Sequence, residues 1–141
     1  DCFICEADLY ISDLSIFDAE LSRSCYYGKM VPGFSDDWVF DWDGERITRV
    51  GKEGTDRYNM VGVSYFKKAD AAVIRDAIDA AYEKPGYEGL YWDEIVDRQL
   101  DKLNLDIHPV EKEQIVEIDS VAELAVIDES YREVLEKMQA E

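Results

Sequence analysis

The order of hydrophobic and polar positions predicts strands and helices that alternate along the chain. Short apolar runs that stop at a turn or a charged residue predict strands over residues 2–7, 24–31, 61–66, 106–110 and 114–118. Apolar residues at helical spacing predict helices over residues 13–21, 68–83, 90–103 and 121–138.

One local signal is specific enough to predict a hairpin. Residues 37–42 and 45–50 are two alternating runs that flank Asp43-Gly44, and an Asp-Gly pair in that position is typical of a two-residue turn. The polar, glycine-punctuated residues 51–59 then predict a loop. The element order favours one domain over residues 1–141, with a mixed α/β sheet flanked by helices and a β-hairpin excursion.

Composition narrows the possible partners. The chain has 141 residues, 47% of them hydrophobic, and a net charge of −18. Such an acidic surface repels phosphate backbones and anionic lipid, so we expect neither nucleic-acid nor membrane binding. Cys2 and Cys5 form a C-x-x-C without the further ligands that zinc needs, because His108 is the single histidine. We therefore expect buried, reduced cysteines and a cytoplasmic protein.

Two carboxylates stand out by their position. Asp8 follows the first predicted strand, and Asp119 follows the last one, just before Ser120 caps the final helix. Ligands of open α/β sheets lie outside the strand ends, so we expect both aspartates at one rim, where they could hold a divalent metal. Glu6 and Glu117 precede them by two residues and should face the same side, as additional ligands or, more simply, in structural roles.

Six short segments occur in an order and at spacings that resemble a known family. They are Glu6-Ala7-Asp8, residues 22–27, Asp37-Trp38-Val39-Phe40, residues 62–66, Leu90-Tyr91-Trp92-Asp93 and residues 116–120. Together they resemble the carboxy-terminal part of the CTP:phosphocholine cytidylyltransferases, which belong to the nucleotidyltransferases that activate sugar phosphates. The resemblance runs from Asp1 to about Tyr131 and implies the corresponding part of a Rossmann-like nucleotidyltransferase fold.

The resemblance also implies a reaction and a metal. Enzymes of this family transfer CMP from CTP to phosphocholine, giving CDP-choline and pyrophosphate, and the positions of Asp8 and Asp119 hold Mg²⁺. Both reactants are anions, so the ion neutralises charge and aligns the displacement. Without the resemblance, Asp119 would read as a solvated residue or a cap of the last helix.

The same resemblance implies a choline pocket. Trp38, Trp92 and Tyr65, with Asp93 nearby, match positions where the family binds the quaternary ammonium, whose recognition needs aromatic faces and a carboxylate. Ordinary packing is the alternative for the three aromatic rings. Arg23 could meet a substrate phosphate, although surface solvation is the simpler interpretation.

The glycine-rich, lysine-bearing loop of the family's nucleotide-binding half has no counterpart in the sequence. We therefore expect a fragment that is inactive alone and that exposes a sheet edge through which it could self-associate. Two alternatives remain: a fragment of a sugar-1-phosphate nucleotidyltransferase, and a non-catalytic choline-binding or assembly module.

Overall fold

The computed structural model describes residues 1–140. Its regular elements, in chain order, are β1 (Cys2–Cys5), β2 (Leu9–Ile11), β3 (Cys25–Trp42), β4 (Ile47–Phe66), α1 (Lys68–Tyr82), α2 (Trp92–Asp97), β5 (Asp106–Pro109), β6 (Ile115–Glu117), α3 (Val121–Ile127) and α4 (Arg132–Gln139). Short 3-10 turns lie at Leu14–Phe17, Tyr87–Gly89 and Glu129–Tyr131. No helix in this part of the chain is long and apolar enough to cross a membrane.

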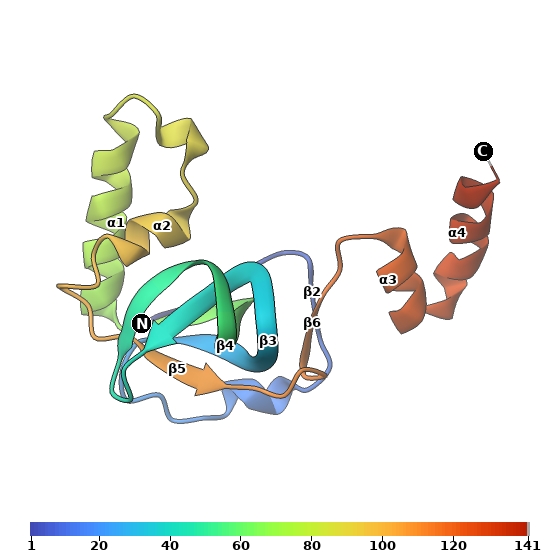
Figure 1. Cartoon of the computed structure of the whole chain (residues 1–141), viewed down its shortest axis with the longest axis horizontal. Coiled ribbons are helices and arrows are strands. Elements are labelled where there is room, and N and C mark those ends of the chain that lie inside the picture. Colours follow the sequence, from blue (N-terminus) through green and yellow to red (C-terminus); the bar gives the residue numbers. More distant parts are fainter. Residues whose placement is uncertain (141) are drawn as a thin grey trace.

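The strands form two sheets, and the larger one is mixed. It has the order β1-β4-β3-β5, in which β3 and β5 are parallel and the other two pairs are antiparallel. A second, two-stranded sheet pairs β2 with β6 in antiparallel fashion. Helices α1 and α2 lie together at one end of the large sheet (Figure 1), which confirms the mixed α/β class.

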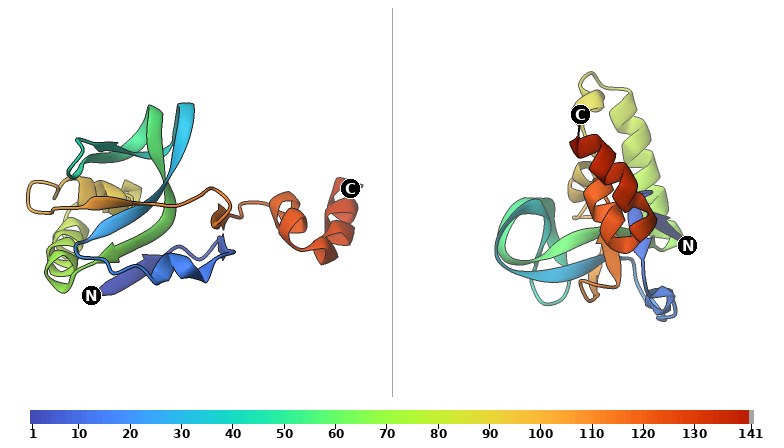
Figure 2. Two further views of the ribbon diagram at one scale, coloured as in Figure 1. Left: turned by 90° about the horizontal axis from the view of Figure 1, so that it is seen from below. Right: turned by 90° about the vertical axis from the view of Figure 1, so that its right-hand side faces the viewer.

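The predicted hairpin is present and much longer than expected. Asp43 accepts the backbone N–H groups of Glu45 and Arg46, each at 2.9 Å, and Gly44 takes a positive φ of 101° in the turn. The loop predicted over residues 51–59 is wrong, because these residues belong to β4. Register shifts let the polar segment stay paired while the hairpin curls over, as Figure 2 shows.

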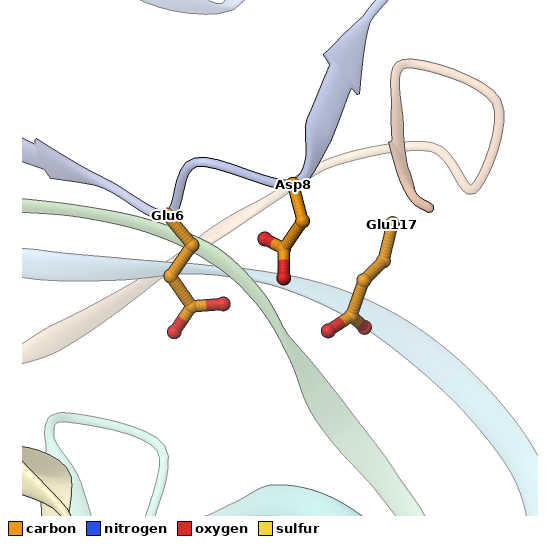
Figure 3. A group of neighbouring side chains, drawn as sticks. All are labelled: Glu6, Asp8 and Glu117. Atoms are coloured by element: carbon orange, nitrogen blue, oxygen red, sulfur yellow. The ribbon is translucent and has the colours of Figure 1, made fainter. Parts of the chain in front are cut away.

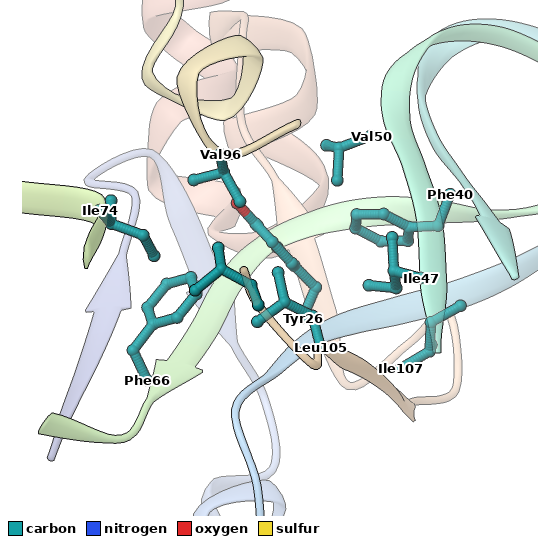
Figure 4. Close-up of a cluster of buried hydrophobic side chains, with 10 residues drawn as sticks. Tyr26, Phe40, Ile47, Val50, Phe66, Ile74, Val96, Leu105 and Ile107 are labelled. Atoms are coloured by element: carbon teal, nitrogen blue, oxygen red, sulfur yellow. The ribbon is translucent and has the colours of Figure 1, made fainter. Parts of the chain in front are cut away.

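Alternation along β3 sends neighbouring side chains into two cores. Tyr26 faces the side covered by α1 and α2, and Tyr27 faces the other side. The first core, drawn in Figure 4, consists of Tyr26, Phe40, Ile47, Val50, Phe66, Ile74, Val96, Leu103, Leu105 and Ile107. The second consists of Ile16, Cys25, Tyr27, Val61, Val63, Val110 and Ile115.

Three predicted helices are shorter than expected. Residues 13–21 contain only the 3-10 turn, and α2 ends at Asp97 instead of residue 103. The last helix is interrupted at Asp128, whose side chain accepts the N–H of Ser130 at 2.9 Å and starts a new turn. The resulting pair α3 and α4 stands away from the sheets (Figures 1 and 2), and Val126 is 82% exposed there.

The first strand also differs from its prediction. All four residues of β1 are exposed, because β1 is an edge strand of the large sheet. Cys2 and Cys5 are therefore exposed rather than buried, and only Cys25 lies in a core. The predicted free sheet edge exists; self-association through it stays a prediction.

Candidate active site

Pairing of β2 with β6 brings together two segments that are more than 100 residues apart in the sequence. The carbonyl oxygen of Asp8 accepts the N–H of Ile118 at 2.9 Å, so Asp8 lies opposite the residue that precedes Asp119. The strands run antiparallel, and the start of β2 therefore meets the end of β6. The segments that carry Asp8 and Asp119 therefore lie side by side through this local antiparallel pairing.

The side chains that cluster there are Glu6, Asp8 and Glu117. Each offers a carboxylate oxygen, and these oxygens all lie within 4.8 Å of one another. Figure 3 shows the three side chains pointing to the same side, two from the segment between β1 and β2 and one from the end of β6. Hard oxygen donors without histidine or cysteine suit Mg²⁺, which takes few ligands from protein.

Close approach of the backbone shapes this cluster. The N–H of Glu6 donates to the carbonyl oxygen of Gly62 at 2.9 Å, and Gly62 has a positive φ of 72°. A Cβ atom at Gly62 would lie 2.7 Å from the Glu6 Oε2 atom. A glycine is therefore needed where β4 passes beneath the carboxylate of Glu6.

The crowded charges change the acidity of the two glutamates. Partial burial, followed by the charges of Asp8 and Asp37, raises the pKa of Glu6. Partial burial and then the charge of Asp119 raise the pKa of Glu117, with smaller effects from Asp37, Asp8 and Glu6. Asp119 thus lies near Glu117, but its carboxylate is outside the group of three; its backbone N–H donates to Glu123. Metal binding by the pair Asp8 and Asp119 stays a prediction.

A fourth carboxylate, Asp93, is buried at the start of α2. It is 4% exposed and accepts a hydrogen bond from the hydroxyl of Tyr26 at 2.9 Å. Burial raises its pKa to about 6, the Tyr26 hydroxyl opposes that rise, and the charge of Glu6 adds to it. We refer to Asp93 and the Glu6–Asp8–Glu117 cluster together as the acidic site, because the charge of Glu6 acts on Asp93.

This acidic site has no cation of its own within the chain. Among residues 1–140, no Lys, Arg or His nitrogen lies within 4.0 Å of a carboxylate oxygen of Glu6, Asp8, Asp93 or Glu117. Uncompensated carboxylates, one of them buried, are costly. The arrangement therefore fits positively charged ligands, such as a metal ion, an ammonium group or both.

The predicted aromatic residues are divided between the two cores: Trp38 and Trp92 pack against the first core and Tyr65 against the second, and a choline pocket stays a prediction. The Trp92 ring stacks on Tyr26 with centroids 6.0 Å apart, whereas Trp38 meets Tyr91 edge-on at 5.5 Å. The Lys52 ammonium lies 5.7 Å from the centroid of Trp38 and already occupies that neighbourhood.

Tyr65 and Arg23 lie elsewhere. Tyr65 packs on Phe3 at 5.1 Å on the other face of the sheet, and its hydroxyl donates to Asp1 at 2.8 Å. Arg23 is held by Asp106, to which its Nε donates at 3.2 Å. Within residues 1–140 no hydrogen bond or ion pair links Arg23 to the acidic site.

Some residues of the acidic site carried little signal in the sequence. The two-residue spacing placed Glu6 and Glu117 on the expected side, but gave no reason to rank them with Asp8. Tyr26 and Asp37 both belong to β3; the Tyr26 hydroxyl donates to Asp93, and the charge of Asp37 acts on Glu6 and Glu117. No sequence pattern reveals these interactions.

Sequence comparison adds two relatives. Over 130 residues the chain is 52% identical to a 2-aminoethylphosphonate cytidylyltransferase of Lancefieldella rimae, covering 92% of this chain and 53% of the relative. The chain is related to the cytidylyltransferases. The resemblance drawn from the sequence is thereby confirmed. A choline-phosphate cytidylyltransferase of Streptococcus pneumoniae is 26% identical over 128 residues, which are 90% of this chain and 56% of that protein.

Solved structures agree with this cytidylyltransferase relationship. The CTP:phosphocholine cytidylyltransferase of Streptococcus pneumoniae superposes with a TM-score of 0.76 at 25% identity, over 92% of this chain and 57% of that one. A nucleoside-diphosphate-sugar pyrophosphorylase of Vibrio cholerae shares the fold at a TM-score of 0.54 and 16% identity, over 82% of this chain and 50% of that one. No family model matches the chain. The chain spans about half the length of the curated relatives it matches.

Proposed function

We propose that this chain forms the metal- and acceptor-binding part of a cytidylyltransferase. In the reaction, a phosphonate or phosphate oxygen of the acceptor attacks the α-phosphorus of CTP, the bond from that phosphorus to the bridging oxygen breaks, and pyrophosphate leaves. The observation that carries the proposal is the 52% identity with a 2-aminoethylphosphonate cytidylyltransferase over 92% of the chain.

Mg²⁺ is the proposed cofactor. Asp8 and Asp119 are its proposed ligands. Glu6 and Glu117 are close enough to take part, because their carboxylate oxygens lie within 4.8 Å of one another and of an Asp8 oxygen. A bound Mg²⁺ would supply charge neutralisation on the phosphate oxygens.

The acceptor that fits the site best is a small phosphonate with a primary ammonium, 2-aminoethylphosphonate. A primary ammonium has three N–H donors and pairs with carboxylates such as Asp93 and Glu6. The trimethylammonium of phosphocholine has no donor and depends on aromatic faces. Tyr65 packs against the second core, whereas Trp38 and Trp92 pack against the first, and this separation argues for the ammonium acceptor.

Calorimetric titration of the 141-residue chain with Mg²⁺ and each acceptor tests the proposal. We expect 2-aminoethylphosphonate to bind about tenfold or more tightly than phosphocholine, and glucose 1-phosphate not to bind. Asp93→Asn should weaken 2-aminoethylphosphonate binding by about tenfold or more, because a charge-assisted pair is lost. The exposed Asp101→Asn, which changes net charge equally, is the control.

Three results would overturn this proposal. Tighter binding of phosphocholine would return the acceptor to choline phosphate, and tighter binding of glucose 1-phosphate would favour a sugar acceptor. Binding of any acceptor that is unaffected by Mg²⁺ and by Asp8→Asn would point instead to a module without catalytic chemistry.

A further inference from the structure

A groove separates α1 from the segment that follows it. It has a volume of about 720 Å³, which is in the range of small-molecule sites. The apolar residues of its lining include Val73, Ala77, Leu90 and Ile95. Its residues are all different from those of the acidic site.

Three positive side chains border this groove: Lys84, Arg98 and Lys102. Among residues 1–140, no carboxylate oxygen lies within 4.0 Å of their charged nitrogens. Lys102 Nζ donates only to the neutral amide oxygen of Gln99, at 2.8 Å. Asp76 is the one acidic residue of the lining, and its carboxylate is paired with Arg75 at 2.6 Å.

Several free basic groups of the molecule gather at this one groove. The chain has 15 basic residues, and seven of them form ion pairs with carboxylates within residues 1–140. Of the remaining basic residues, Lys84, Arg98 and Lys102 border the same groove. This combination favours a ligand with several negative charges and an apolar part.

We propose that the groove binds an organic polyphosphate of the nucleoside-triphosphate type. Lys84, Arg98 and Lys102 receive the phosphates, and the guanidinium of Arg98 can form two parallel hydrogen bonds to one phosphate. Tyr87, which lines the groove and is 36% exposed, offers a ring beside which a base can lie. The proposal does not depend on the cytidylyltransferase reaction.

Titration of the 141-residue chain with ATP at low ionic strength, with EDTA present, tests this site. EDTA removes the metal that phosphates would need at the acidic site. We expect one ATP to bind per chain. Pyrophosphate should bind more weakly than ATP because it lacks the nucleoside, and adenosine should bind more weakly because it lacks the phosphates. The double variant Lys84→Glu/Arg98→Glu should bind ATP at least about tenfold more weakly.

The matched control is Lys112→Glu/Lys137→Glu, which changes the net charge equally at residues outside the groove. Equal losses in both double variants would mean that bulk charge alone acts, and would overturn the proposal. So would the absence of ATP binding, or a loss of binding in Asp8→Asn instead of the groove variant. Circular dichroism checks folding, and Lys84→Gln/Arg98→Gln replaces the charge reversal if that variant unfolds.

Discussion

Asp93 allows a direct test of the acidic site. A buried carboxylate without a neighbouring cation should lower the stability of the folded protein, and binding of a cationic ligand should compensate for that loss. Its side chain is 4% exposed, and burial raises its pKa from 3.8 to about 6. Asp93→Asn keeps the shape and retains an oxygen that can accept the hydroxyl hydrogen of Tyr26. The substitution removes the charge and replaces one carboxylate oxygen by an NH2 group.

The sign and size of the stability change follow from the raised pKa of Asp93. The folded state binds the Asp93 proton more tightly than the unfolded state. Ionisation of Asp93 therefore does not lower the stability of the fold at a pH below the unfolded-state pKa. Above that pH the loss of stability grows, and it reaches its full value once the pH passes the folded-state pKa. The full shift corresponds to about 3 kcal/mol at about pH 7.5, and about 1.6 kcal/mol remains at about pH 5. Asp93→Asn should therefore gain about 1.4 kcal/mol more stability at the higher pH.

Urea unfolding followed by circular dichroism at both pH values measures this difference. Asp101→Asn is the control, because it removes an exposed acid at an equal change in net charge. The variant should be more stable than the wild type and should bind 2-aminoethylphosphonate less well. A gain that is the same at both pH values, or a loss of stability, would refute the electrostatic argument.

Two further substitutions test the framework of the site. Gly62→Ala places a Cβ atom 2.7 Å from the Glu6 carboxylate at a φ of 72°. We expect this variant to lose about 1–3 kcal/mol of unfolding free energy in urea and to bind Mg²⁺ more weakly in calorimetry. An unchanged Mg²⁺ affinity would show that Glu6 is not a ligand. Ser24→Ala removes the buried hydroxyl that accepts the Lys67 N–H at 2.8 Å, so it should lower the free energy of unfolding by about 1–3 kcal/mol. The control, Ser22→Ala at an exposed position, should change it very little. Equal effects of the two substitutions would contradict the assigned hydrogen bond.

The sequence by itself determined the features that depend on neighbouring residues. The Asp43-Gly44 turn was predictable because an Asp side chain and a glycine satisfy that turn locally. Helix α1 was predictable because its apolar residues recur at helical spacing over four turns. Asp8 could be selected as a candidate site residue because it follows an apolar run. The family could be inferred because six short segments occur in the expected order.

Only the tertiary structure decided which side chains meet. Residues 51–59 look like a loop in isolation, and they are a strand because β3 supplies a partner for their backbone. Glu6 and Glu117 join Asp8 because β2 pairs with β6 across more than 100 residues of sequence. Such long-range pairing depends on the register and curvature of whole strands, which no short sequence window contains.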